Sequence, residues 1–144
     1  MKKAIYFIWI ISLLYACNND EEKTFEYKVS IRNTSTHLLT IDAYREGIIR
    51  QHLEINTSEN GLSCNYYNDF FIGYQLAGCL IDSVKFTFDN GKGYLTSINY
   101  PTEYELSNHD GIFGSGPGFE KIEGYTYEFI ITQEDFNNAH DLPK

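Results

Sequence analysis

The chain has 144 residues, which is enough for one domain, and its 20 acidic residues outnumber its 11 basic ones. The formal net charge of −9 argues against nucleic-acid binding, because that function needs a basic face. The same charge argues against electrostatic adhesion to anionic lipid. A partner selected by charge would therefore be basic.

The N-terminus has the pattern of a secretory signal peptide. Two lysines follow Met1, and residues 4–16 then form an uncharged, mostly apolar stretch. A membrane-spanning helix needs about 20 apolar residues, so this stretch is too short to span a bilayer comfortably. A basic start, a short apolar run and a small residue at the cleavage site are typical of a signal peptide. We therefore expect residues 1–16 to be removed.

The signal peptide ends in Leu14-Tyr15-Ala16-Cys17, which resembles the lipobox of bacterial lipoproteins. The resemblance implies cleavage before Cys17, thioether lipidation of its sulfur, and acylation of the new amino group with a fatty acid such as palmitate. More than one acyl chain makes membrane anchoring stable. The alternative is a plain secreted protein in which Cys17 is an ordinary cysteine.

Residues 17–24 are predicted to form a polar tether between the lipid and the domain. Their acidic run resembles the export signal that sends lipoproteins to the outer face of the outer membrane in some Gram-negative bacteria. The alternative is a solvated tether that keeps the domain off the headgroups. Removal of residues 1–16, with their two lysines and no acid, changes the formal charge from −9 to −11.

Lipidation of Cys17 would leave two cysteines, Cys64 and Cys79. The compartments outside the inner membrane are oxidising, so an even remaining pair predicts a disulfide. The alternative is two buried free thiols, which are also common in protein cores.

The domain, residues 25–144, is predicted to be mostly β, because short segments alternate hydrophobic with polar residues. Polar residues 57–63 are predicted to form a loop, and residues 101–118 a long irregular stretch. The expected strands cover residues 25–31, 38–44, 49–55, 70–76, 80–88, 94–100 and 125–131. Their inward faces are expected to hold Phe25, Tyr27, Val29, Ile31, Leu39, Ile41, Ala43, Ile49, Leu53, Ile55, Val84, Phe86 and Phe88.

Turn and cap signals separate these segments. Residues 89–92 predict a tight hairpin, because their Asn-Gly pair supplies the positive φ that such turns require. Thr132 is the expected N-cap of a short helix that reaches about Ala139. The pattern predicts an all-β fold, a single antiparallel β-sandwich of about seven strands, immunoglobulin-like. Trp9 lies in the signal peptide, so the domain lacks the core tryptophan of antibody-type domains.

No convincing catalytic or metal-binding pattern is present. The four histidines, His37, His52, His109 and His140, are scattered without the spacing of a zinc motif. No Gly-x-Ser-x-Gly nucleophile elbow occurs. We therefore expect a protein that is not an enzyme and that uses no cofactor or metal.

The best candidate ligand site is the run Tyr66-Tyr67-Asn68-Asp69-Phe70-Phe71. Aromatic rings can cover the apolar face of a sugar, while amide and carboxylate groups take its hydroxyls. The alternative is that these rings fill the hydrophobic core.

Asp82-Ser83-Val84 resembles the short acceptor motif for O-glycosylation of exported proteins in the same bacterial groups, which makes Ser83 a candidate modification site. Together with residues 32–35, 89–92 and 125–136, this segment resembles small uncharacterised lipoproteins of Gram-negative bacteria that feed on glycans at their surface. The resemblance brings no assigned activity.

Two functions follow from these expectations. The first is a lipid-anchored binding or structural module of the cell envelope, accessory to glycan binding at the outer surface. The second is an inhibitor or immunity protein against a basic hydrolase or toxin, with residues 108–118 as the inserted loop. The acidic charge is the feature that favours the second function.

Overall fold

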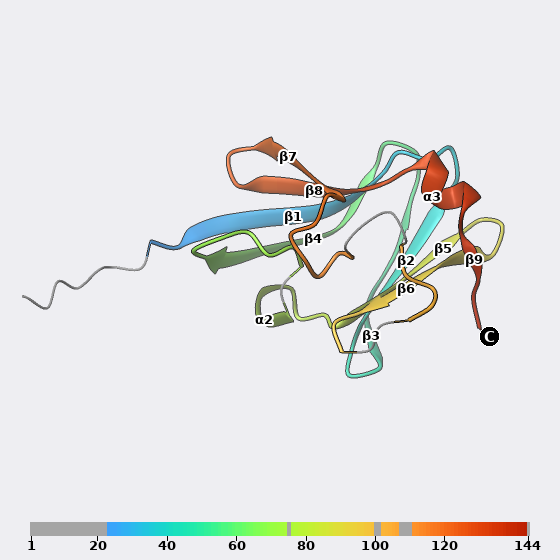
Figure 1. Ribbon diagram of the computed structural model, residues 1–144, viewed down its shortest axis with the longest axis horizontal. Coiled ribbons are helices and arrows are strands. Elements are labelled where there is room, and N and C mark those ends of the chain that lie inside the picture. Colours follow the sequence, from blue (N-terminus) through green and yellow to red (C-terminus); the bar gives the residue numbers. More distant parts are fainter. Residues whose placement is uncertain (1–22, 75, 100–101, 107–110, 144) are drawn as a thin grey trace, which may run out of the picture.

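The computed structural model describes residues 23–74, 76–99, 102–106 and 111–143 (Figure 1). The predicted signal peptide, Cys17 and most of the tether lie outside these residues. The described residues form two β-sheets and two short helices. None of their helices is long and apolar enough to cross a membrane.

The first sheet has four strands in the order β4-β1-β8-β7. Its members are β1 (Phe25–Asn33), β4 (Asn60–Asn68), β7 (Phe119–Glu123) and β8 (Thr126–Ile131). The first strand of the domain is central, because β1 pairs antiparallel with β4 and parallel with β8.

The second sheet has five strands in the order β3-β2-β5-β6-β9. Its members are β2 (Leu39–Arg45), β3 (Ile48–Ile55), β5 (Ser83–Phe88), β6 (Lys92–Ser97) and β9 (His140–Asp141). All of its pairs are antiparallel, and β3 forms an edge.

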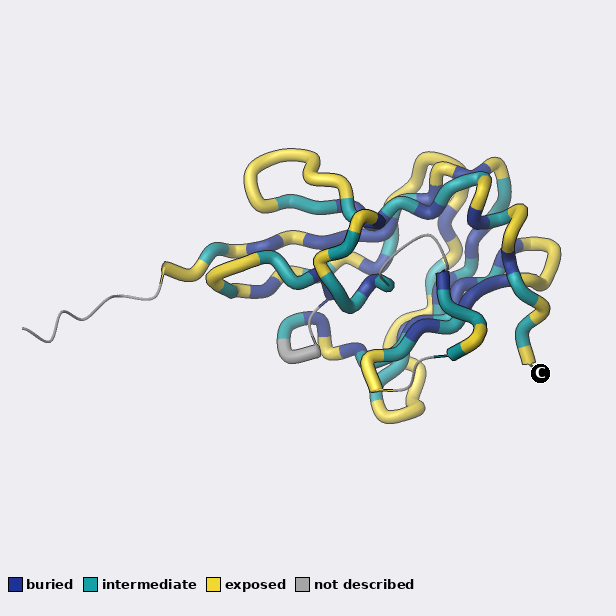
Figure 2. Tube along the Cα trace, viewed as in Figure 1, coloured by how far each residue is buried: buried dark blue, intermediate teal, exposed yellow. Residues whose placement is uncertain are grey.

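The two sheets share one hydrophobic core, which gives a sandwich-like arrangement (Figure 2). The predicted inward faces of β1, β2 and β5 are confirmed at nine positions, whose side chains are at most 5% exposed, whereas Phe25 at the start of β1 is half-buried. The confirmed residues are Tyr27, Val29, Ile31, Leu39, Ile41, Ala43, Val84, Phe86 and Phe88.

Two short helices complete the described structure, α2 (Leu76–Cys79) and α3 (Gln133–Asn137). The predicted N-cap at Thr132 is confirmed, because its hydroxyl accepts a hydrogen bond from the Asp135 backbone N–H at 3.2 Å. The Asp135 carboxylate accepts from the Thr132 N–H at 2.7 Å, which completes a capping box.

The prediction of about seven antiparallel strands is wrong in two respects. The described residues contain nine strands, and the β1–β8 pair is parallel. Three of the nine are not among the predicted strands: β4, part of which falls in a predicted loop, β7, whose charged sequence lacks an apolar alternation, and the two-residue β9. The immunoglobulin order is not confirmed, because the first two strands lie in different sheets.

The predicted loop over residues 57–63 is wrong in its second half, where β4 has already begun. The Asn60-Gly61 pair has the composition of a turn, but it lies in a strand. A Cβ atom on Gly61 would come within 2.8 Å of the Ile55 side chain, so the glycine allows the two segments to approach closely.

The predicted strand over residues 70–76 is also wrong. The chain leaves β4 at Asn68, whose side-chain amide donates to the Phe70 carbonyl oxygen at 3.0 Å. Gly73 then adopts a positive φ of 70°, and α2 follows. These bends replace extended backbone, although the segment is rich in strand-forming aromatic residues.

The predicted inward face of β3 is wrong at Ile49, which is 53% exposed. Ala43 pairs with Gln51 and Tyr44 pairs with Ile49, so Arg50 is an extra residue in the ladder. Such a bulge shifts the alternation of faces along the strand. Only the far end of β3 keeps its expected orientation, with Ile55 buried and Leu53 half-buried.

Candidate binding site

The run proposed as a ligand site, residues 66–71, is divided between the core and the surface. Tyr66 is buried, and its hydroxyl accepts a hydrogen bond from the Ile72 N–H at 3.3 Å. Phe71 is half-buried and stacks on Tyr127 with 3.8 Å between ring centroids. These two rings are core residues, as the alternative interpretation of the run predicted.

The rest of the run lies at the surface. Tyr67 is 69% exposed and Phe70 is 59% exposed, with exposed Asp69 and half-buried Asn68 between them. Tyr67 leaves the outer face of β4, because alternate residues of a strand point to opposite sides. The part of the run that could touch a ligand is therefore residues 67–70.

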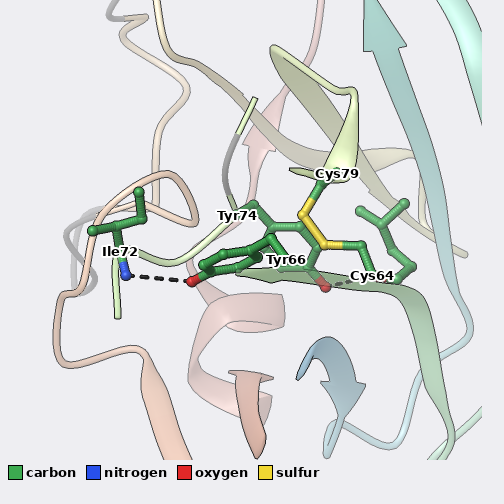
Figure 3. Close-up of a disulfide and its surroundings, with 6 residues drawn as sticks. Cys64, Tyr66, Ile72, Tyr74 and Cys79 are labelled. Atoms are coloured by element: carbon green, nitrogen blue, oxygen red, sulfur yellow. Dashed lines mark hydrogen bonds between the residues drawn. A yellow bond between two sulfur atoms is a disulfide. The ribbon is translucent and has the colours of Figure 1, made fainter. Parts of the chain in front are cut away.

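The Cys64–Cys79 disulfide is confirmed, and it joins β4 to α2 (Figure 3). Its Cα atoms lie 5.3 Å apart. A Cβ atom on Gly78 would collide with the Tyr66 side chain, so the glycine lets α2 pack directly on that ring. The short helix is thus held against β4 by a covalent bond and a close contact.

Tyr74 adds a polar anchor beneath the same helix. Its hydroxyl donates to the Leu62 carbonyl oxygen at 2.6 Å, and the side chain is fully buried (Figure 3). Burial raises the pKa of the Tyr74 hydroxyl well above its usual value of 10.0, because the phenolate would be desolvated. The ring remains a neutral hydrogen-bond donor in the core.

A cavity of about 400 Å³ opens between the β2–β3 hairpin and the α2–β5 connection. Its described lining consists of Arg45, Arg50, Gln51, Cys79 and Leu80. The volume falls in the range of small-molecule sites. We call this space the arginine cavity.

Two residues with a positive φ lie near the arginine cavity: Leu80, which lines it, and Glu46, which follows the lining residue Arg45. Leu80 has a φ of 59°, and Glu46 in the β2–β3 turn has a φ of 54°. Residues other than glycine rarely adopt this left-handed backbone conformation. Leu80 lies between the buried residues Cys79 and Ile81, and its own side chain is 56% exposed at the cavity. Such strain tends to gather at functional sites.

The charge of the arginine cavity is opposite to that of the chain. The sequence has three arginines, and two of them line this space. The third, Arg32, pairs with Glu128 at 3.3 Å on the other sheet. Among the described residues, the carboxylate near Arg45 is that of the exposed Glu46 at 3.9 Å, and no carboxylate lies within 4.0 Å of the Arg50 guanidinium.

Sequence pattern alone does not predict the arginine cavity. Arg45 and Arg50 are separated by the Glu46-Gly47 turn and are brought together by strand pairing and a bulge. The wall from α2 depends on the disulfide. One feature of the sequence does point to this cavity: two of the chain's three arginines, Arg45 and Arg50, flank the same hairpin turn.

A second cavity of about 340 Å³ lies on the other side of the hairpin turn and has an acidic lining. Asp82 accepts hydrogen bonds there from the Glu46 N–H at 2.6 Å and from the Ser83 hydroxyl at 2.9 Å. Ser83 is half-buried. Its O-glycosylation stays a prediction, which the intact mass of the mature protein would test.

The described histidines lie apart from both cavities' linings. His37 contacts Asp89 at 3.1 Å and stacks on Phe136, and His52 contacts Asp42 at 2.6 Å. His109 lies outside the described residues. Within the described ranges, no group of three His, Cys, Asp or Glu side chains could hold a metal ion.

Comparisons with known proteins give no name to this arrangement. No protein-family model, no curated protein and no solved structure matches the chain. The geometry and chemistry of the described residues therefore carry the functional proposals.

Proposed function

We propose that this protein is an exported lipoprotein, held in the outer membrane by Cys17, that binds glycans as an accessory module. The single observation that supports glycan binding is the exposure of Tyr67 and Phe70 with Asn68 and Asp69 between them. The aromatic faces would cover the apolar face of a sugar ring, and the amide and carboxylate would accept or donate to its hydroxyls.

The sequence supports the anchor. A basic start, an uncharged run and the Leu-Tyr-Ala-Cys ending precede a tether that reaches β1 at Phe25. The proposal places the domain within a short chain length of the membrane, on either its periplasmic or its outer face. It does not include an immunoglobulin-like strand order, because β1 and β2 lie in different sheets.

Replacement of Cys17 by Ser tests the anchor. We expect the wild-type protein to partition into the detergent phase and Cys17→Ser to remain in the aqueous phase, since the acyl chains supply the membrane affinity. Continued detergent partitioning of the variant would contradict lipidation at Cys17.

A glycan array tests the binding function. We expect the wild-type protein to bind, and the double variant Tyr67→Ala with Phe70→Ala to lose binding, because stacking platforms supply much of the affinity for sugars. Ile122→Ala is the control, since this residue is also an exposed hydrophobic side chain, 51% exposed, and it lies on β7 outside residues 67–70.

Two outcomes would contradict glycan binding. The first is a blank array for the wild-type protein. The second is an equal loss of array binding in Ile122→Ala, which would show that the loss is not specific to Tyr67 and Phe70. A blank array combined with tight binding of a basic hydrolase such as lysozyme would favour the inhibitor function instead, because the formal charge of −11 after removal of residues 1–16 attracts basic partners.

A further inference from the structure

The geometry points to a second ligand site: the arginine cavity binds the carboxylate of an acidic sugar. This inference rests on the proposed glycan function for the class of ligand, and on the cavity for the acidic group. The cavity is distinct from the exposed aromatic pair. Cys64, which carries the disulfide wall, lies on the inner side of β4, whereas Tyr67 lies on the outer side.

The charge distribution indicates an anionic ligand. An acidic chain has enough carboxylates to pair every arginine, and Arg32 shows such a pair with Glu128 at 3.3 Å. Arg50 has no such partner within 4.0 Å among the described residues, and the Arg45 contact with Glu46 is long and exposed. Two arginines with unused hydrogen-bonding capacity thus line one concave site.

The donor chemistry favours a carboxylate. A guanidinium group presents a planar fork of N–H donors that matches the two oxygens of a carboxylate. Gln51 adds an amide that can donate to or accept from a sugar hydroxyl. Leu80 and the disulfide supply apolar surface for the carbon skeleton. A volume of about 400 Å³ suits one or two sugar rings.

The wall of the arginine cavity formed by α2 and Leu80 is preorganised. The disulfide holds α2 on β4, and the close contact of Gly78 with Tyr66 allows no shift toward the sheet. Leu80 is fixed in a left-handed conformation between two buried residues. A site that is already ordered loses less entropy when its ligand binds.

The experiment uses mature lipidated protein in detergent micelles and isothermal titration calorimetry. The probe is trigalacturonate, and the neutral probe is galactotriose, which lacks the carboxylates. We expect trigalacturonate to bind, with an affinity that falls as salt concentration rises, and galactotriose to bind at least tenfold more weakly at this site.

Variants locate the binding. Arg50→Gln and Arg45→Gln should each weaken trigalacturonate binding about tenfold or more, because each removes a charge-assisted hydrogen bond. Arg50→Lys should recover part of the affinity, since it restores the charge without the fork. Lys121→Gln on β7 is the control for charge alone and should leave the affinity unchanged. Unchanged melting temperatures would confirm that the variants are folded.

The outcomes separate this inference from the proposed function. Equal affinity for the acidic and neutral probes would overturn the carboxylate site and leave glycan binding intact. Trigalacturonate binding that persists in both arginine variants would place the site elsewhere. Preference for a capped glutamate peptide over the saccharide would overturn the sugar as the ligand. Absence of any trigalacturonate binding would overturn the carboxylate site, whereas the proposed glycan function is decided separately by the array.

Discussion

The two hairpins of the five-stranded sheet differ in how far their side chains are buried. In the β5–β6 hairpin, Val84, Phe86 and Tyr94 are at most 1% exposed. In the β2–β3 hairpin, β2 is buried on one face, but β3 exposes Ile48 and Ile49 by 58% and 53%. Both hairpins belong to the same sheet, yet one is built for packing and the other presents apolar and basic side chains to solvent. Packing against the core therefore does not explain the hydrophobic side chains that β3 exposes.

The largest contrast is expected from truncation of one side chain in each hairpin. Phe86→Ala should lower the free energy of unfolding by about 3–5 kcal/mol, because it leaves a cavity in the core. Ile49→Ala should change it by no more than about 0.5 kcal/mol, since the side chain is already solvated. Urea denaturation measures both. A loss above 2 kcal/mol for Ile49→Ala would indicate that β3 is a core strand after all.

Removal of the Cys64–Cys79 disulfide should destabilise the wall of the arginine cavity more than the β5–β6 hairpin. Cys64→Ser with Cys79→Ser should lower the free energy of unfolding by about 3 kcal/mol, because a loop closed across 15 positions no longer restricts the unfolded chain. Hydrogen exchange should accelerate most in α2 and β4, where loss of the crosslink also allows local opening, and less in β5 and β6, which respond only to the lower global stability. Uniform acceleration would show that the disulfide does not act locally on the arginine cavity.

Glycines in the two hairpins should respond differently. A methyl group on Gly93 in β6 would collide with the Phe86 backbone carbonyl, so Gly93→Ala should cost about 1–3 kcal/mol or prevent folding. Gly47 in the β2–β3 turn has free space but a φ of 74°, so Gly47→Ala should cost about 1 kcal/mol. Thermal denaturation compares them, and a larger effect at Gly47 would reverse the expected order.

The smallest effect is a pH dependence in the β2–β3 hairpin. The hydrogen bond from His52 to Asp42 raises the pKa of His52 above its usual value of 6.5. The resulting stabilisation is present below the unfolded-state pKa and is lost as pH rises through the folded-state pKa. NMR titration should show the raised pKa, and Asp42→Asn should return it toward 6.5. A pKa that does not respond to Asp42→Asn would contradict the pairing.

Sequence periodicity predicts the central strands well, because burial on one face imposes a strict alternation. Leu39, Ile41 and Ala43 follow this rule, and their neighbours across the strand pair do as well. Local rules also identify the Thr132 cap, whose partner Asp135 lies three residues away. These features depend on residues that are close in sequence or on one repeated pattern.

Features that depend on distant contacts could not be predicted in this way. The exposure of Ile49 results from a bulge at Arg50, and no local signal marks that extra residue. The division of residues 66–71 requires knowledge that β4 extends to Asn68. The arginine cavity needs the β2–β3 pairing, the disulfide and the backbone of Leu80 together, so only the assembled fold reveals it.

The central position of β1 has a mechanical consequence. A force applied at the N-terminus pulls along β1, which is hydrogen-bonded to β4 on one edge and to β8 on the other. Because these bonds run across the strand, the pull loads both ladders in shear, and many bonds must break together. A force at the C-terminus would peel the two-residue β9 away one bond at a time. The domain is therefore expected to resist traction best from the end that follows the tether.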